Sequence, residues 1–130
     1  SSAASDVYKR QVLVAGGRGV KDESELALLK ELADLLGGQL AASRPLVDNG
    51  FLPHDAQIGQ SGTAVKPDMI INVAISGSVQ YQVGMQNAKC IVSINHNAAS
   101  PIFDISHYGA VADFKAVLPA VIAEIKNRRA

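Results

Sequence analysis

Residues 69–75 read Met69-Ile70-Ile71-Asn72-Val73-Ala74-Ile75, and this largely apolar run decides the fold class. A run that is apolar on both faces is typical of a central strand in a parallel sheet. The run stops at Ser76-Gly77, and Ser78 or a neighbour then begins a short helix that we expect to end near Met85. The stretch therefore predicts a buried strand, a polar loop and a helix in that order.

Other apolar runs repeat this order along the chain. We predict further strands at 12–15, 39–42 and 89–95, and short strands at 56–58, 102–105 and 110–111. One helix is predicted from a cap at Asp22 or Ser24 to the glycines at 37–38, and a final helix from Asp113. Alternating strands and helices predict an α/β fold, a doubly wound, mostly parallel sheet with flanking helices of Rossmann-like type.

Two prolines modify these expectations. Pro45 should hold Arg44 in an extended backbone and end the second strand, with a loop of about a dozen residues after it. Pro119 lies inside the final helical pattern, so a kink or a late start is expected there. Residues 1–11 share no pattern with the rest and are predicted to be a non-native or disordered N-terminal extension, which leaves 12–130 as the domain.

The composition excludes several classes of function. The chain is 48% apolar and 18% charged, as in a globular protein, and its 12 basic residues equal its 12 acidic ones. We therefore expect neither nucleic acid nor a membrane surface as partner, and the apolar runs are far short of the roughly 20 residues of a membrane span. A single cysteine, Cys90, excludes an internal disulfide and indicates a cytoplasmic or otherwise intracellular setting.

Polar residues follow the predicted strands, at the edge where parallel sheets bind ligands. They are Gly16 to Arg18, Ser43-Arg44, Ser76 to Tyr81, Asn95 and Asp113, and the segment Gln57-Ile58-Gly59-Gln60-Ser61-Gly62-Thr63 adds more. Their small residues and side-chain donors suit an anionic, planar ligand. Gly16-Gly17-Arg18-Gly19 alone is not a dinucleotide fingerprint, and a tight turn explains it equally well. The three histidines lack metal spacing, so no metal site is predicted.

From residue 12 to about 127, the chain resembles the C-terminal FAD-binding domain of the electron transfer flavoprotein alpha subunit. The resemblance rests on an ordered series: Gly-Gly-Arg-Gly, Ala-Ser-Arg, Asp-x-Gly, Gly-Gln-Ser-Gly, Ile-Ser-Gly-x-x-Gln, Ile-Asn and Val-Ala-Asp. It implies an electron carrier without substrate turnover of its own, with FAD as cofactor. It also implies a beta subunit, flavoprotein dehydrogenases as electron donors and a downstream acceptor.

The resemblance also implies which residues contact FAD: Arg18, Ser43, Arg44, Ile58, Gly59, Gln60, Ser61, Ser76, Gly77, Ser78, Val79, Gln80, Tyr81, Asn95, Asp113 and Phe114. In the family, the position of Arg44 lies over the flavin ring and that of Ser61 lies near ring atom N5. The 76–80 loop holds the phosphates, and the positions of Asn95 and Asp113 serve the adenosine end.

Two residues depart from the family pattern. Ser61 stands where the family commonly has Thr, and the hydroxyl is kept. Tyr81 stands where it commonly has His, and a phenol can donate a hydrogen bond but brings no positive charge at neutral pH.

Two further functions stay open on sequence grounds. The same edge could hold an ADP-like ligand without redox work, or the chain could be a subunit-assembly module. The isolated domain is also expected to self-associate through its exposed partner face.

Overall fold

The computed structural model describes residues 12–59 and 64–130, and within them five strands form one sheet. The sheet order is β2-β1-β3-β4-β5, and every neighbouring pair is parallel. The strands are β1 (Val12–Gly16), β2 (Gln39–Ala42), β3 (Met69–Val73), β4 (Cys90–Asn95) and β5 (Tyr108–Val111). The predicted doubly wound α/β fold is confirmed. The predicted extension at 1–11 and the segment 60–63 lie outside the described residues.

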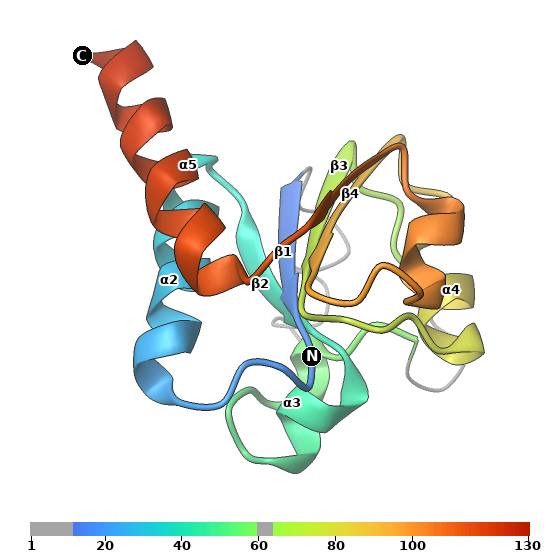
Figure 1. The fold of residues 1–130 in the computed structure, drawn as a ribbon. Coiled ribbons are helices and arrows are strands. Elements are labelled where there is room, and N and C mark those ends of the chain that lie inside the picture. The colour runs from blue at the N-terminus through green and yellow to red at the C-terminus, as the bar shows by residue number, and fades with distance from the viewer. Residues whose placement is uncertain (1–11, 60–63) are drawn as a thin grey trace.

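Helices cover both faces of the sheet (Figure 1). Helices α2 (Glu23–Leu35) and α5 (Phe114–Arg129) pack on one face, where Leu29 and Leu118 are fully buried. Helix α4 (Val79–Met85) and the 3₁₀ helix η3 (Pro101–Ile105) cover the other face. The short helices α3 (Arg44–Asp48) and η1 (His54–Ala56) follow β2. Among these helices, none has the length and apolar character needed to cross a bilayer.

The two long helices begin at the predicted caps. The Asp22 side chain accepts from the Glu25 amide, and the Asp113 side chain accepts from the Lys115 amide. Hydrogen bonds from the Ser24 hydroxyl, which has the larger effect, and from the Glu25 amide lower the pKa of the Asp22 carboxyl below its ordinary value. Helix α5 runs continuously through Pro119, so the predicted late start is wrong.

Arg44 and the residues around it differ from the prediction. Arg44 is the first residue of helix α3, not an extended residue. Pro45 is tolerated because the first-turn amides of a helix need no intrahelical acceptor. The predicted strand at 56–58 is reduced to one bridge, between Ala42 and Gln57.

Two more strand predictions are corrected. Residues 102–105 belong to η3, which starts at Pro101. A proline has no amide to contribute to a strand ladder and fits the start of a helix instead. Strand β3 ends at Val73, two residues early, because Ala74 has φ +57° and turns the chain.

The face of the sheet under α4 contains a chain of buried polar side chains. Asn72 on β3 and Ser93 on β4 are fully buried and stand opposite each other in the strand register. The Tyr81 hydroxyl donates to Asn72 Oδ1 at 2.5 Å, and Asn72 Nδ2 donates to Ser93 Oγ at 3.2 Å. Burial raises the pKa of the Tyr81 phenol well above its ordinary value, so the group is neutral at physiological pH.

The imidazole of His107 extends the pairing between β4 and β5. Its Nδ1 accepts from the Ile91 amide at 2.9 Å, while the His107 amide donates to the Ile91 carbonyl at 2.8 Å. A side chain thus takes the place of a backbone carbonyl at the start of the outermost strand.

The buried phenol makes stability depend on alkaline pH. The folded state holds the Tyr81 proton more tightly than the unfolded state, whose phenol has a pKa of about 10. Stability is therefore fully present below about pH 10 and falls as pH rises toward the folded pKa, by at most about 1.4 kcal/mol per pH unit. Urea unfolding across pH should show this fall in wild type and in Tyr108→Phe, but not in Tyr81→Phe. Equal alkaline losses in wild type and Tyr81→Phe would contradict it.

Removing the imidazole acceptor should weaken the β4–β5 edge. His107→Ala leaves the amide of buried Ile91 without its acceptor, so we expect a loss of about 1–2 kcal/mol in the free energy of unfolding. His107→Asn is the matched control, because its Oδ1 can accept the same bond. Chemical unfolding of both variants checks this, and equal losses would refute the role of the ring nitrogen.

Candidate functional site

The site lies where the chain leaves β1 and β3 in opposite directions. From β1 the chain passes through α2 to β2 on one side, whereas from β3 it passes through α4 to β4 on the other. Such a switch point opens a crevice outside the carboxyl ends of the strands. Arg18 follows β1 and Ser76 follows β3, so both residues stand at this crevice.

Ala74 turns the chain after β3 into the crevice. Its φ of +57° is left-handed, a conformation that costs a residue with a Cβ about 1–2 kcal/mol. The Ala74 amide donates to the Ile94 carbonyl at 2.9 Å, and its own carbonyl accepts from the Gly19 amide at 3.4 Å. A Cβ on Gly17 would stand 2.3 Å from the Ala74 carbonyl oxygen, so this turn requires glycine there.

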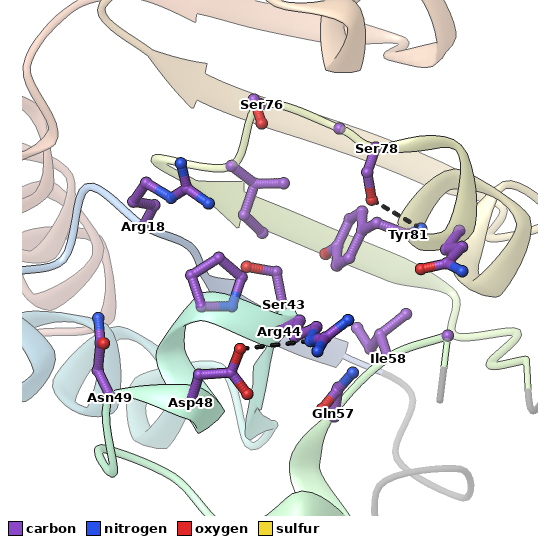
Figure 2. Close-up of a pocket in the computed structure, with 15 residues that line it drawn as sticks. Arg18, Ser43, Arg44, Asp48, Asn49, Gln57, Ile58, Ser76, Ser78 and Tyr81 are labelled. Carbon is purple, nitrogen blue, oxygen red and sulfur yellow. Dashed lines mark hydrogen bonds and ion pairs between the residues drawn. The ribbon is translucent and has the colours of Figure 1, made fainter. Parts of the chain in front are cut away.

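A cavity of about 630 Å³ lies on one side of the switch point (Figure 2). Its volume is within the range of small-molecule and cofactor sites, about 300–1,000 Å³. The lining residues come from the loops after β1 and β3, from helices α3 and α4 and from the segment before residue 60. They are Arg18, Ser43, Arg44, Pro45, Asp48, Asn49, Gln57, Ile58, Gly59, Ile75, Ser76, Gly77, Ser78, Gln80 and Tyr81. We call this the first cavity.

Arg44 is an exposed cation held at the rim of the first cavity. Its Nε lies 3.3 Å from Asp48 Oδ2, one helical turn away on α3, and 73% of its side chain is exposed. The neighbouring Ser43 is buried and donates its hydroxyl to the Gly16 carbonyl at 3.3 Å. Helix α3 therefore presents a guanidinium whose charge Asp48 partly offsets.

Two glycines let the walls of the first cavity pack closely. Gly59 has φ +85°, and a Cβ there would stand 2.6 Å from the Gln80 carbonyl oxygen on α4. Gly77 has φ +92°, and a Cβ there would stand 2.7 Å from the Ile102 amide nitrogen of η3. The loop ends at Ser78, whose hydroxyl caps α4 by accepting from the Tyr81 amide. These contacts fix the 76–78 loop against α4 and η3.

A second cavity of about 620 Å³ lies on the other side of the switch point. It is lined by Arg18, Gly19, Lys21, Ala74, Ser76, Ile94, Asn95, His96, Asn97, Ser100, Ala112, Asp113, Phe114 and Lys115. Arg18 and Ser76 line both cavities, so the two hollows meet at these residues.

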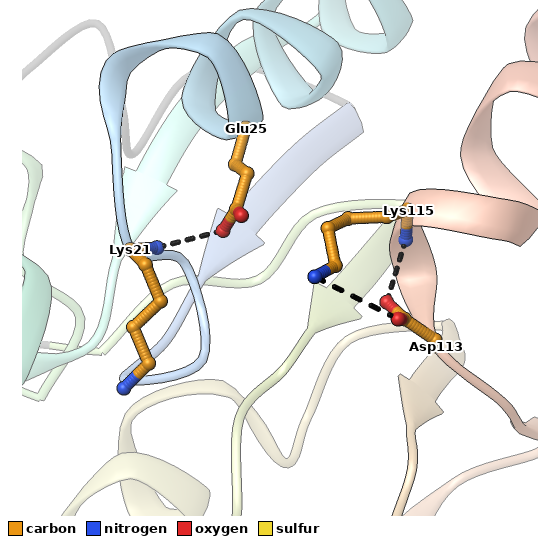
Figure 3. Close-up of polar contacts among 4 residues, drawn as sticks. All are labelled: Lys21, Glu25, Asp113 and Lys115. Atoms are coloured by element: carbon orange, nitrogen blue, oxygen red, sulfur yellow. Dashed lines mark hydrogen bonds and ion pairs between the residues drawn. The ribbon is translucent and has the colours of Figure 1, made fainter.

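The lining of the second cavity contains more cations than anions. Arg18, Lys21 and Lys115 contribute ammonium or guanidinium groups, and Asp113 is the carboxylate of this lining. Lys115 Nζ lies 3.8 Å from Asp113 Oδ2, while the backbone amide of Lys21 is bonded to Glu25 (Figure 3). The cavity therefore favours a ligand that carries negative charge.

The predicted contact residues separate into four groups. Arg18, Ser43, Arg44, Ile58, Gly59, Ser76, Gly77, Ser78, Gln80 and Tyr81 line the first cavity. Asn95, Asp113 and Phe114 line the second. Val79 is 78% exposed and lines neither, because the first residue of α4 points to solvent. Gln60 and Ser61 lie outside the described residues.

Several cavity residues were missed by the sequence analysis. Asp48 and Asn49 reach the first cavity because α3 forms where a loop was expected. Gln57, which the sequence analysis placed in the ligand-binding segment 57–63, lines the same cavity beside its bridge to Ala42. Lys21 and Lys115 in the second cavity could have been found, since each lies within three residues of a predicted contact. Within the described ranges, no cluster of His, Cys, Asp or Glu could hold a metal ion.

The donor chemistry of the two cavities fits a dinucleotide. A guanidinium and a hydroxyl stand where the hollows meet, which suits a central pyrophosphate. The first cavity adds the apolar Ile58 and Ile75 and the Tyr81 ring beside its donors, which suits a flat heterocycle. An elongated ligand with an anionic middle therefore matches the shape and the chemistry.

Comparison with known proteins agrees with this chemistry. A family model described as the electron transfer flavoprotein FAD-binding domain matches residues 6–86. The electron transfer flavoprotein subunit alpha of Syntrophomonas wolfei is 40% identical over 126 residues, which are 97% of this chain and 40% of the relative. That of Thermoanaerobacterium thermosaccharolyticum is 45% identical over 122 residues, 94% of this chain and 37% of the relative.

A third relative carries a different name. Protein FixB of Rhizobium meliloti is 44% identical over 128 residues, which are 98% of this chain and 36% of the relative. The chain thus spans about two fifths of the length of the curated relatives it matches. With a family match over more than half of its residues, the chain belongs to the electron transfer flavoprotein alpha-subunit family, in its FAD-binding domain, and its cofactor is FAD.

Proposed function

We propose that this chain is the FAD-holding part of an electron carrier, which accepts electrons from flavoprotein dehydrogenases and passes them to a downstream acceptor. The observation that carries the proposal is the meeting of two cavities at Arg18 and Ser76, on the switch point of the sheet. Bound FAD supplies the reversible uptake of electrons, and the protein supplies binding, orientation and electrostatics.

The proposed roles of the residues follow the two cavities. The 76–78 loop and the first residues of α4 hold the phosphates through their hydroxyls and backbone, with the Arg18 guanidinium beside them. Arg44 stands over the flavin ring in the first cavity, and its charge stabilises electron density that the ring gains. Asn95 and Asp113 serve the adenosine end in the second cavity. Gln60, Ser61, Val79 and Phe114 remain proposed contacts.

The proposal also extends to assembly and location. The carrier has no substrate turnover of its own and works with an electron transfer flavoprotein beta subunit. We place it inside the cell, in the cytoplasm for a bacterial-type protein. The relatives named electron transfer flavoprotein support these assignments through their similarity over nearly the whole chain.

Occupation of both cavities by one molecule should appear in binding experiments. The purified chain should show the absorption spectrum of a bound flavin, either as purified or after FAD is added to the apo form. FAD should bind at least roughly tenfold more tightly than FMN or ADP, since each of these fills one cavity only. Fluorescence titration of the three ligands measures this. Equal affinity for ADP and FAD would favour an ADP-like ligand, and no thermal shift with FAD would favour an assembly module.

A charge-matched pair of variants tests the meeting point of the cavities. Arg18→Ala should weaken the binding of FAD more than the binding of FMN or of ADP, because the guanidinium borders both cavities. Lys30→Ala is the control: it removes one positive charge from α2, where Lys30 pairs with Asp34 away from both cavities. Equal effects of the two substitutions on FAD affinity would overturn the assignment of Arg18.

The ion pair on α3 should set the redox potential of the bound flavin. Arg44→Ala should lower the midpoint potential and leave the fold intact, because the removed charge stabilises electrons on the ring. Since 1.4 kcal/mol is about 59 mV for one electron and the side chain is well solvated, we expect a change on the order of tens of millivolts. Spectroelectrochemical titration measures this shift.

Asp48 provides the opposite substitution. Asp48→Asn should raise the potential, because Arg44 then loses the carboxylate that offsets its charge. Arg44→Lys should stay nearer to wild type than Arg44→Ala. An unchanged midpoint in both Arg44→Ala and Asp48→Asn would refute an electrostatic role for α3.

A further inference from the structure

A continuous line of hydrogen bonds connects the first cavity to η3 through the interior of the sheet. It starts at Tyr81 on the cavity wall and passes through Asn72 and Ser93. Ser93 Oγ lies 2.7 Å from Ser106 Oγ, and the Ser106 hydroxyl donates to the Ile102 carbonyl at 2.7 Å. Asn72, Ser93 and the Tyr81 side chain are buried, so water does not compete for these bonds.

The last acceptor fixes the direction of every proton in the line. A carbonyl oxygen can only accept, so the one hydroxyl proton of Ser106 is donated to the Ile102 carbonyl. Ser93 must then donate to Ser106, and it can only accept from Asn72. Asn72 therefore turns its amide nitrogen toward Ser93 and its oxygen toward Tyr81, which must donate.

The first cavity consequently meets Tyr81 as an acceptor. The one phenol proton is committed to Asn72, and only oxygen lone pairs are left for a ligand. The phenol can donate one hydrogen bond, and in this line that bond goes to Asn72.

The same line ends on the loop proposed to hold the phosphates. The Ile102 amide donates to the Ser76 carbonyl at 2.8 Å, and Gly77 packs against the Ile102 backbone. The Ser78 hydroxyl caps the Tyr81 amide, so the path returns to the residue where it began. The orientation of the phenol and the position of the 76–78 loop thus depend on one closed set of contacts.

We propose that Ser106, Ser93 and Asn72 are positioning residues that hold Tyr81 as an acceptor-only part of the first cavity, which selects a ligand edge carrying an N–H donor. This rests on the proposed placement of the flavin ring in that cavity. In the oxidised flavin ring the N–H donor is the imide at N3, whereas N1, N5 and the two carbonyl oxygens accept. The line of hydrogen bonds therefore selects the imide edge and rejects a ring methylated there.

The test compares FAD with 3-methyl-FAD, in which a methyl group replaces the imide proton. Both ligands are titrated into the apo forms of wild type, Ser106→Ala, Ser106→Thr and Asn72→Leu. Ser106→Thr keeps the hydroxyl that fixes the direction of the line, whereas Ser106→Ala removes it. Asn72→Leu keeps a similar side-chain shape and leaves the Tyr81 proton free to turn into the cavity. All four proteins keep the Tyr81 ring, so steric effects of the methyl group cancel between them.

The expected result is a difference in selectivity. Methylation should weaken binding to wild type and Ser106→Thr roughly three- to tenfold more than binding to Ser106→Ala and Asn72→Leu, the range of one net hydrogen bond. The same methylation penalty in all four proteins overturns the proposal while FAD binding itself stands. No binding of FAD to wild type overturns the proposed function, and the methylation comparison with it.

A second measurement reads the phenol without any ligand. The Raman doublet of tyrosine differs between a donating and an accepting hydroxyl, and subtraction of the Tyr81→Phe spectrum isolates Tyr81. The apo wild type and Ser106→Thr should give a donating signature that Asn72→Leu loses. An accepting signature in wild type overturns the proposal, whether or not FAD binds.

Discussion

Parallel pairing of β1 with β3 is the constraint on which the site depends. The two strands lie side by side in register, and the chain leaves them toward opposite edges of the sheet. The loops that follow them therefore diverge and leave a gap between them. The gap between them becomes the junction of the two cavities, and the loops after β2, β4 and β5 enlarge it on either side. The core clusters on both faces of the sheet hold this arrangement in place.

The interior of the sheet contributes more than support. Buried polar groups are costly unless they are hydrogen-bonded, and among the described residues no buried side-chain nitrogen or oxygen lacks a partner. Asn72 and Ser93 meet that requirement by bonding to each other and to groups on α4 and after η3. Through these bonds, the Ile102 carbonyl of η3 fixes the orientation of the Tyr81 hydroxyl on the wall of the first cavity. A purely apolar pair at these two positions would pack the strands equally well but would leave the phenol unfixed.

Sequence reasoning predicted most of what depends on local pattern. Apolar runs and caps located β1, α2 and β3, and the rule that parallel strands end at one edge grouped Arg18, Ser43 and Ser76 correctly. It failed where a proline can begin a short helix as well as end a strand: α3 begins beside Pro45, and η3, which starts at Pro101, stands where a strand was expected. The direction of the Tyr81 hydrogen bond could not be predicted from the sequence. It is set by the Ile102 carbonyl, 21 positions further along the chain, which only the folded structure connects to Tyr81.

The left-handed turn at Ala74 limits how this chain can diverge. A Cβ placed on Gly19 would stand 2.6 Å from the Cβ of Ala74, so the two positions share room for one methyl group. Glycine at position 74 would remove the backbone strain and free that space. A β-branched residue at position 74 would meet both an unfavourable φ and a steric clash. A side chain at position 19 therefore fits only if residue 74 gives up its own methyl group, and the choice of residue at either position restricts the choice at the other.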